Sequence, residues 1–346
     1  MKIIFDCERM KHPYTGLSEY CSQLGKALQS TAADNEVAFY VPPGYKNYFG
    51  HNSRYHIYSS IHKIFPLRVR QTDVWHTNSQ RPLIKSGYGM KRIITIHDLN
   101  FLYEKPSQAK IKKYLKAFQG NIDRADAVIT ISGYAKTDIV NHLRLNGKPV
   151  FVVYNGCNVR EFPGYDRPVY RPEAPFLFSL GTVLPKKNFH VLPCLIRNND
   201  YELIIAGKGS DKYARQIMEK AAEYRVADRV RLIGPVSDKD KYWYLKNCTA
   251  FLFPSIAEGF GIPPVEAMHF GKPVFLSALT SLPETGGRYA YYFNDFDPES
   301  MRETFESGMD HYIKTRPEAM IIQHAGRFSW EKSAKACWDI YKSALL

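Results

Sequence analysis

Residues 249–273, TAFLFPSIAEGFGIPPVEAMHFGKP, place an apolar run, a glycine-rich loop and a helical pattern in immediate succession. The run TAFLFPS is typical of a buried strand, so the loop that follows lies beyond the carboxyl end of that strand. Its two glycines permit unusual backbone angles and close approach of a ligand. Prolines are tolerated where a helix starts, and VEAMHFG predicts a helix that ends near Gly271.

Two glutamates flank this loop. Glu258 precedes it, and Glu266 is expected in the first turn of the helix, where exposed amides and the positive end of the helix dipole favour a phosphate. Both carboxylates could face one ligand, because one can accept the two hydroxyls of a ribose and the other those of a sugar. The structural alternative is that Glu266 only offsets the helix dipole and Glu258 is a solvated loop residue.

Strand and helix patterns alternate on both sides of this stretch. MKIIF, EVAFYV, VWHTN, RIITIHDLNFL and AVITIS read as strands of a first sheet, and FLFSLG, YELIIAGKGS and VRLIGPV as strands of a second. Such alternation predicts parallel sheets with helical crossovers. Residues 158–175 carry four prolines and no periodicity, which indicates a linker. The expected fold is therefore α/β, with two doubly wound domains and a site in the cleft outside the carboxyl ends of their strands.

The predicted domains are residues 1–165 and 166–330, with a helix over 331–346 that packs back toward the N-terminal domain. The length of 346 residues suits two domains of this size. No apolar run approaches the roughly 18 residues of a membrane span. The six cysteines form no CxxC pair, so neither a zinc site nor a disulfide framework is expected, and a reduced cytoplasmic setting is predicted.

The first 165 residues are strongly basic, with 23 Lys and Arg against 12 Asp and Glu. Within them, EKPSQAKIKKYLKAF combines Lys105, Lys110, Lys112, Lys113 and Lys116 with an apolar stripe. Such a helix can lie on an anionic membrane surface, or it can be an ordinary surface helix whose apolar side enters the core. No nucleic-acid-binding motif accompanies the charge, so nucleic acid is not an expected partner.

The segment EGFGIPPVEAM resembles the E-x7-E motif of retaining GT-B glycosyltransferases of glycosyltransferase family 4. The subgroup that it most resembles is the mannosyltransferase-like enzymes of bacterial surface-polysaccharide assembly. Further segments resemble that family in the same order along nearly the whole chain: FDCERMKHPYTGLSEYC, ITIHDLNFL, VITISGYAKTDI, VVYNGCN, FLFSLGTVLPKKN, ELIIAGKGS, SLPETGG, YYFNDFDPESM and FSWEKSAKACWDIY.

The resemblance implies a donor site in the C-terminal half. Glu266 corresponds to the glutamate that binds the nucleotide ribose. The first glutamate and the loop after it hold the transferred sugar in the family. The corresponding residues are Glu258, Gly259, Phe260 and Gly261. The basic pair that grips the pyrophosphate corresponds to Lys186 and Lys187, although Thr182 stands where many relatives have an arginine, and a solvated surface pair is the alternative.

Two positions of the N-terminal half complete the implied site. His97 is expected near the reaction centre, with a core histidine as the alternative reading, and Gly16 near the donor phosphates. The residues expected to act in catalysis are therefore His97, Lys187 and Glu258. In glycoside hydrolases one carboxylic acid protonates the leaving group and a second carboxylate acts as base or nucleophile, but the resemblance implies no such roles for Glu258 and Glu266.

The implied reaction is transfer of a hexose with retained configuration from a nucleotide sugar, with mannose from GDP-mannose as first choice. The acceptor is a glycan or lipid-linked glycan of lipopolysaccharide, O-antigen or capsule assembly, and no metal or other cofactor is expected. The alternatives are a UDP-sugar donor (glucose, galactose or N-acetylhexosamine), a nucleotide-sugar epimerase and a non-catalytic glycan-binding protein. A nicotinamide dehydrogenase is disfavoured because no GxGxxG follows the first strand.

Overall fold

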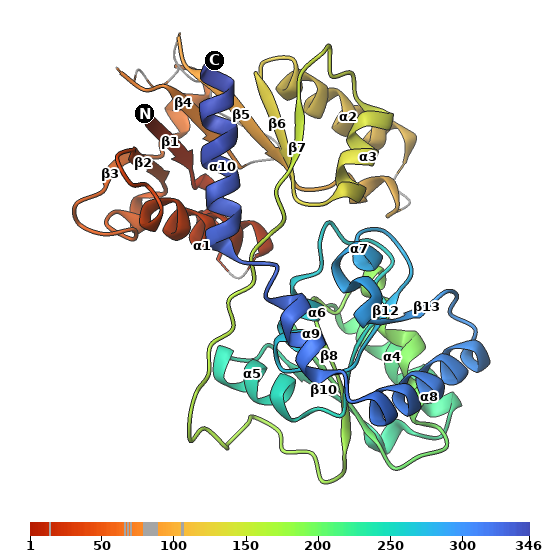
Figure 1. The fold of residues 1–346 in the computed structure, drawn as a ribbon. Coiled ribbons are helices and arrows are strands. Elements are labelled where there is room, and N and C mark those ends of the chain that lie inside the picture. The colour runs from red at the N-terminus through yellow and green to blue at the C-terminus, as the bar shows by residue number, and fades with distance from the viewer. Residues whose placement is uncertain (14, 66, 68, 70, 79–88, 105–106) are drawn as a thin grey trace. The chain divides into compact units, whose positions relative to one another are not determined.

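The computed structural model describes residues 1–13, 15–65, 67, 69, 71–78, 89–104 and 107–346. By its internal contacts the chain divides into two compact units (Figure 1). The first consists of Met1–Gly156 with Phe328–Leu346, and the second of Cys157–Arg327. Residues 153–175, which include the predicted linker, contain no helix or strand.

The first unit is built on a parallel sheet of seven described strands in the order β3-β2-β1-β4-β5-β6-β7. Its strands are β1 (Lys2–Asp6), β2 (Glu36–Val41), β3 (Arg54–Ile57), β4 (Val74–Thr77), β5 (Lys91–Ile96), β6 (Ala127–Thr130) and β7 (Val150–Val152). Its helices are α1 (Gly16–Ser30), α2 (Gln108–Ile122), α3 (Gly133–His142) and α10 (Trp330–Leu345).

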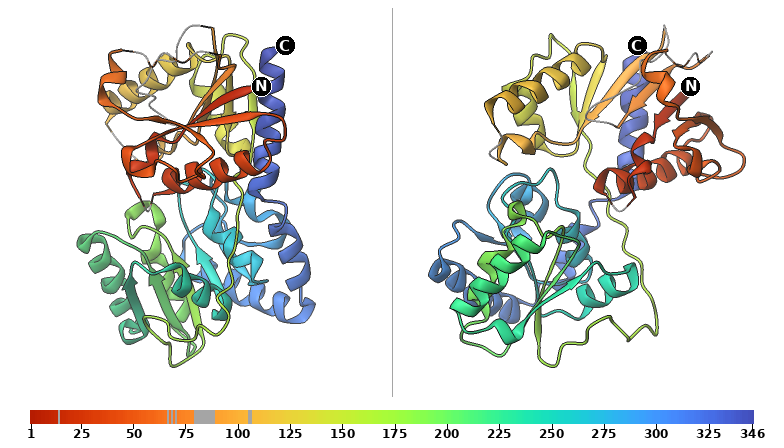
Figure 2. Two further views of the ribbon diagram at one scale, coloured as in Figure 1. Left: turned by 90° about the vertical axis from the view of Figure 1, so that its left-hand side faces the viewer. Right: turned by 180° about the vertical axis from the view of Figure 1, so that it is seen from behind.

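Helices cover both faces of this first sheet, because successive strand residues point to opposite sides. Ile94 and Ile96 of β5 pack with Phe118 of α2 and Ile139 of α3. Thr95 points the other way, and on that face α1 and α10 pack against each other. The views in Figure 2 show the two pairs of helices on opposite sides of the strands.

The basic helix α2 buries its apolar side in this unit. Phe118 is 2% exposed, and Leu115 packs against the same cluster. Lys110, Lys112 and Lys116 are exposed, whereas Lys105 lies outside the described residues. The apolar stripe thus enters the core through Leu115 and Phe118, and the lysine side chains face outward. Among the described helices none is both long and apolar enough to cross a membrane.

The second unit contains a parallel sheet of six strands in the order β10-β9-β8-β11-β12-β13. Its strands are β8 (Phe176–Leu180), β9 (Glu202–Ala206), β10 (Val230–Gly234), β11 (Ala250–Phe253), β12 (Val274–Ser277) and β13 (Tyr291–Phe293). Its α-helices are α4 (Asp211–Glu223), α5 (Asp238–Asn247), α6 (Ile262–His269), α7 (Leu282–Gly286), α8 (Pro298–Thr315) and α9 (Glu318–Ala325).

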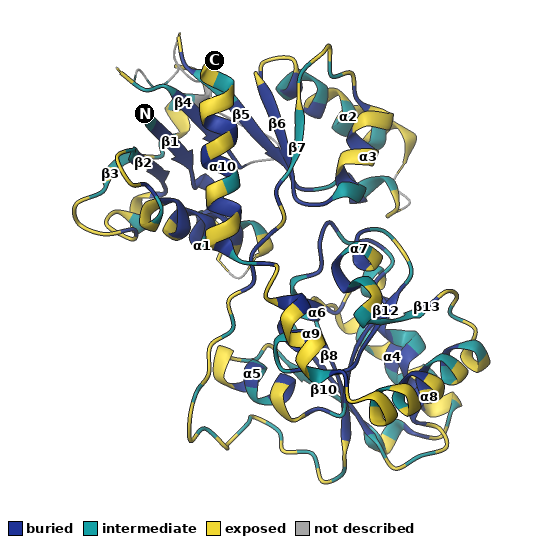
Figure 3. Ribbon diagram, viewed as in Figure 1, coloured by how far each residue is buried: buried dark blue, intermediate teal, exposed yellow. Residues whose placement is uncertain are grey.

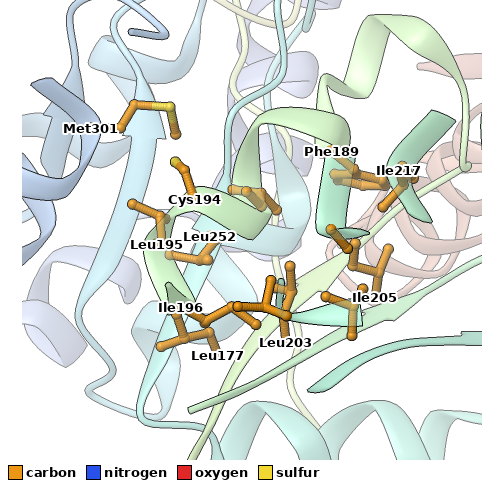
Figure 4. Packing of buried hydrophobic residues seen from close by; sticks show 14 of the residues in the cluster. Leu177, Phe189, Cys194, Leu195, Ile196, Leu203, Ile205, Ile217, Leu252 and Met301 are labelled. Atoms are coloured by element: carbon orange, nitrogen blue, oxygen red, sulfur yellow. The ribbon is translucent and has the colours of Figure 1, made fainter. Parts of the chain in front are cut away.

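A large apolar cluster fills one face of this second sheet (Figure 4). Leu177, Leu203 and Leu252 come from three neighbouring strands and pack against Ile217 of α4 and Met301 of α8. Between β8 and β9 the chain forms a 3₁₀ helix over Phe189–Ile196, with Pro193 inside it. On the other face lie α5 and α6. Figure 3 shows the strands buried between helices whose outer sides are exposed.

The strand orders identify one switch point in each unit. In the first sheet the order reverses between β1 and β4, and in the second between β8 and β11. At such a point the loops leaving the two strands run in opposite directions and open a crevice at the carboxyl edge, where open α/β sheets bind ligands. Each unit therefore has one switch point at which a ligand is expected to bind. The residues of the sequence motifs can now be compared with these two positions.

Candidate functional site

The lysine pair and the glutamate loop meet at the switch point of the second sheet. Residues 181–188 leave β8 and residues 254–261 leave β11. The backbone N–H of Ile256 and the hydroxyl of Ser255 donate to the carbonyl oxygen of Lys186 at 2.9 and 3.1 Å. The two loops are thereby joined through the backbone of Lys186, and this residue contributes at least its carbonyl to the site.

A close backbone approach brings the loop after β9 beside the loop after β8. Gly207 has a φ of +146°, and a Cβ atom there would lie 1.8 Å from the carbonyl oxygen of Gly181. Only glycine fits such a contact. Gly207 of the sequence AGKGS is thus explained by packing between two loops at the carboxyl edge of the sheet.

Lys187 and Glu258 form an ion pair across the switch point. Lys187 Nζ donates to Glu258 Oε1, and the two side chains are 12% and 14% exposed. The ammonium also lies 4.6 Å from the centre of the Phe253 ring. A cation and an anion so shielded from water interact far more strongly than an exposed pair. The pair presents both charges at the place where a ligand of this sheet is expected.

The loop after Glu258 is fixed by hydroxyl groups from the neighbouring strand connection. Thr280 Oγ1 accepts from the backbone N–H of Glu258 at 3.1 Å, and Ser281 Oγ donates to its carbonyl at 3.0 Å. Thr285 Oγ1 donates to the carbonyl of Phe260 at 2.6 Å. Phe260 is 3% exposed, so its side chain faces the protein interior. A ligand could therefore contact Gly259–Gly261 only through their backbone atoms.

Helix α6 begins earlier than the sequence indicated. Gly261, with a φ of +100°, is its N-cap, and Ile262 is the first helical residue. Both prolines fit within the first turn because the amides there need no acceptor. Glu266 is consequently the fifth residue of α6, so the prediction that it lies in the first turn is wrong. The alternative that it only offsets the helix dipole loses its basis too, because that effect falls off beyond the first turn. Gly271 follows the last helical residues as predicted.

Glu266 has side-chain partners on α5 instead. Its Oε1 accepts from Lys241 Nζ at 2.7 Å and from the Tyr242 hydroxyl at 3.4 Å. Glu266 is 6% exposed. Burial lowers the pKa of the Lys241 ammonium, but its neighbours Glu266, Tyr242 and Asp238 together outweigh this and raise it overall. These contacts fix the position of the Glu266 carboxylate.

His97 follows the last residue of β5 in the first unit and is 5% exposed. Burial lowers its pKa to about 4, assisted by the charge of Arg9 and opposed by a hydrogen bond with the Asn78 backbone. The imidazole is therefore neutral at physiological pH. Its Nε2 atom has no hydrogen-bond partner among the residues the structure describes. The Tyr20 ring packs edge-on against it at 4.5 Å.

Gly16 is the first residue of α1 and follows the N-cap residue Thr15, whose hydroxyl accepts a hydrogen bond from the backbone N–H of Ser18. Nothing lies within 4 Å of a Cβ atom built at Gly16, so packing does not require a glycine there. Gly16 and His97 belong to the first unit and the other predicted site residues to the second. Within the second unit the structure brings Lys187, Glu258 and the loop together.

Buried ionisable groups that the sequence interpretation left out lie at the switch point of the first sheet. Asp6 ends β1 and accepts from the Glu8 backbone N–H at 2.9 Å and from the Thr77 hydroxyl at 3.2 Å. Glu8 is 3% exposed and pairs with Lys11 and, at 3.7 Å, with Arg9. Burial raises the pKa of Asp6 to about 7, with an opposing contribution from the Glu8 amide.

This pKa predicts that Asp6→Asn stabilises the protein at alkaline but not at acidic pH. The pKa of about 7 in the folded protein lies above the ordinary aspartate value of 3.8, so protonated Asp6 stabilises the fold at low pH, and this contribution is lost as the pH rises through 7. The full difference is on the order of 4 kcal/mol. Thermal unfolding at about pH 4.5 and about pH 8.5 should show that Asp6→Asn has a higher melting temperature than the wild type only at the higher pH. Equal shifts at both pH values, or the same behaviour in the exposed-site control Asp34→Asn, would contradict it.

The partners of Glu266 and the loop hydroxyls were also missed. Lys241 lies 25 positions before Glu266, on another helix, and no local spacing rule joins them. Thr280, Ser281 and Thr285 follow β12 at the carboxyl edge, and their position after the apolar run VFLS was a usable signal.

Two family descriptions match the chain. "Glycosyl transferases group 1" matches residues 167–335 and "Glycosyltransferase Family 4" matches residues 16–161, so together they span most of the sequence. Among curated relatives, the serotype-specific mannosyltransferase WbdA of Escherichia coli is 27% identical over 266 residues. That match covers 70% of this chain, and the chain spans about a third of WbdA (32%). The O-antigen chain mannosyltransferase B of Escherichia coli is 23% identical over 383 residues, covering 99% of this chain and 100% of the relative.

A solved structure of similar fold is that of HepE from Anabaena in complex with UDP and glucose. Its TM-score is 0.71 at 16% identity, with 99% of this chain and 100% of that chain covered. The two parallel α/β units and these likenesses confirm the predicted fold class, the GT-B fold of glycosyltransferases. With both family descriptions matched, in sequence order and in their own halves of the chain, the protein belongs to glycosyltransferase family 4.

Proposed function

We propose that the protein transfers a hexose, with retained anomeric configuration, from a nucleotide sugar to a glycan or lipid-linked glycan. Mannose from GDP-mannose is the preferred donor, since the relatives compared above include mannosyltransferases of O-antigen synthesis. The product then belongs to lipopolysaccharide, O-antigen or capsule assembly. The observation that carries the proposal is the shielded Lys187–Glu258 pair at the switch point of the second sheet.

In this proposal each part of the second unit has a separate task. Glu266 accepts hydrogen bonds from the ribose hydroxyls. Lys187, with Lys186 beside it, neutralises the charge that grows on the diphosphate as the bond from the sugar C1 to the phosphate oxygen breaks. Glu258 and the backbone of Gly259–Gly261 orient the sugar. Lys187 is already paired with Glu258. The donor phosphate would therefore bind Lys187, and the sugar hydroxyls Glu258, while the two side chains stay in contact with each other.

The acceptor is assigned to the first unit, with His97 near the sugar. As the acceptor oxygen bonds to C1 on the face that the diphosphate leaves, its proton passes to a phosphate oxygen, and configuration is retained. A neutral His97 suits this role, because it can exchange hydrogen bonds with sugar hydroxyls without adding charge. No metal is assigned to the site, and unchanged turnover in the presence of a chelator is the expected result.

A peripheral place on the inner face of the cytoplasmic membrane is part of the proposal. The exposed lysines of α2 support it by charge alone, because the apolar side of that helix is buried. Binding to anionic vesicles should then vanish at high salt, as expected for electrostatic attraction without insertion. Binding that resisted salt would contradict this part.

The test of the proposed function is transfer of radiolabelled sugar. The purified protein is incubated with GDP-mannose or a UDP-sugar and a bacterial lipid and glycan extract, and label is followed into the acceptor fraction. NMR of the product then reports the anomeric configuration. Transfer from GDP-mannose with retention is expected, and an inverted product or no turnover of any nucleotide sugar would contradict the proposal.

A UDP-sugar donor is the second candidate. It is favoured by one observation, the likeness in fold to HepE, whose structure holds UDP and glucose. Glucose, galactose and N-acetylhexosamine conjugates belong in the same assay. Conversion of a nucleotide sugar to its epimer would show that the protein is an epimerase. Glycan binding without turnover would show that it is a non-catalytic glycan-binding protein.

A further inference from the structure

Lys241 makes its closest polar contact with Glu266. The two charged atoms are 2.7 Å apart, and the side chains are 18% and 8% exposed. Lys241 also lies 3.5 Å from Asp238 one turn earlier, but that carboxylate is 63% exposed and is therefore screened by water. The ammonium further lies 4.3 Å from the centre of the Tyr242 ring. The pair with Glu266 is thus the dominant contact of Lys241.

We propose that Lys241 is a positioning residue of the donor site, which orients Glu266 and balances its charge so that the carboxylate binds the ribose hydroxyls of an incoming nucleotide. This rests on the proposed function, and within it on the ribose role of Glu266. Lys241 itself contacts the carboxylate and not the nucleotide.

Three observations support this inference. First, Lys241 and Tyr242 lie on α5 and both reach the same oxygen, Oε1 of Glu266. The Tyr242 hydroxyl has a single proton and shares it with the Asn158 carbonyl, so Lys241 is the main donor to Oε1 and the tyrosine a weaker one. Supporting residues that hold a carboxylate in this way are the usual means of orienting a ligand-binding group. Second, the Tyr242 hydroxyl also lies 3.2 Å from the Asn158 carbonyl oxygen, so its own position is fixed.

The third observation concerns charge. A nucleoside diphosphate brings at least two negative charges to the sheet edge where Glu258 and Glu266 already stand. Glu258 is balanced by Lys187, and Glu266 by Lys241. Each carboxylate of the E-x7-E motif therefore has its own lysine, from a different element. Without Lys241, Glu266 would oppose the anion that it is meant to help bind, or would take up a proton in its buried position.

The inference is tested by measuring dissociation constants for a nucleoside diphosphate and its 2′,3′-dideoxy analogue by calorimetry. The variants are Lys241→Met, Lys241→Arg, Glu266→Gln and the double variant Lys241→Met/Glu266→Gln. Lys246→Met, an exposed lysine on the same helix, is the matched control. Methionine keeps most of the lysine volume, and the double variant removes both charges, so a folded protein is available even if one unpaired charge destabilises.

The expected result is that Lys241→Met weakens binding of the ribonucleotide by roughly tenfold, the equivalent of one charged hydrogen bond. Binding of the dideoxy analogue should be unchanged, so the preference for ribose falls. Lys241→Arg should restore the preference in large part. In the Glu266→Gln background, Lys241→Met should have no further effect, because a positioning residue acts only through the group that it positions.

The outcomes separate the inference from the function on which it rests. A wild-type preference for ribose in Lys241→Met would overturn the inference alone. Equal weakening of both nucleotides, persisting without Glu266, would mean that Lys241 contacts the phosphates directly and would also overturn it. A wild-type protein that binds nucleotides without preferring ribose would overturn the ribose role of Glu266, and one that binds no nucleotide would overturn the proposed function.

Discussion

Replacing Glu266 by alanine is expected to weaken nucleotide-sugar binding by roughly 10²–10⁴-fold. A carboxylate that accepts from two ribose hydroxyls makes two charged hydrogen bonds, each of about 1.5–3 kcal/mol, and every 1.4 kcal/mol is about tenfold in affinity. The substitution also leaves the Lys241 ammonium without its buried partner, so its position changes as well. Calorimetric titration with the donor that the wild type binds measures the effect.

Loss of folding must be separated from loss of binding in this experiment. Breaking a buried ion pair can cost about 3–5 kcal/mol of stability. Glu266→Gln retains the volume and one acceptor, and should weaken binding while unfolding closer to the wild type. Glu306→Ala removes an exposed carboxylate from α8, on the opposite face of the same sheet, and should bind normally. Wild-type affinity in a folded Glu266→Ala protein would remove Glu266 from the site.

Replacing Lys187 by methionine is expected to lower kcat by roughly 10²–10³-fold, the usual effect of removing one group that stabilises developing charge. The ammonium is largely shielded from water, between Glu258 and the Phe253 ring, where its charge acts strongly. Its loss also leaves the Glu258 carboxylate unbalanced beside the donor phosphates. Steady-state kinetics should therefore show kcat and kcat/KM falling together, because the interaction strengthens as the leaving group departs.

Two comparisons make this prediction specific. Lys187→Arg keeps the charge with different geometry and should retain part of the activity. Lys212→Met removes an exposed lysine of α4 and should leave the rate unchanged. A rise in KM alone would assign Lys187 to donor binding rather than to the reaction. A kcat within twofold of the wild type would exclude it from both.

The order of the elements could be predicted from the sequence because parallel strands buried on both faces are continuous apolar runs, such as AFLF of β11 and ELIIA of β9. Edge strand β3 was not recognised. Its residues Arg54–Ile57 are partly or fully exposed and show no apolar pattern. The start of α6 was misplaced because two successive prolines hide the first turn, in which they are allowed.

Within the candidate site, Glu258 was proposed from the loop that follows an apolar strand and Lys187 from the resemblance to the family, and both lie in loops at the carboxyl edge of the same sheet. Their ion pair could not be predicted, because they lie 71 positions apart and the strand order β8-β11 brings them together. The same holds for Lys241 and Glu266, which meet only through the packing of α5 on α6. Charge balance within a site is a tertiary property, and residue types alone do not reveal it.

Thermal unfolding with a panel of nucleotides shows whether the protein binds a nucleotide and whether Glu266 contributes to that binding. GDP, UDP, ADP, GDP-mannose, UDP-sugars and NAD are added to the wild type and to Glu266→Gln at matched concentrations. A ligand at about 100 times its dissociation constant stabilises by roughly 2.7 kcal/mol. The account predicts that GDP and GDP-mannose raise the melting temperature of the wild type and do so much less in Glu266→Gln. A response to NAD alone, or to no nucleotide, would contradict it.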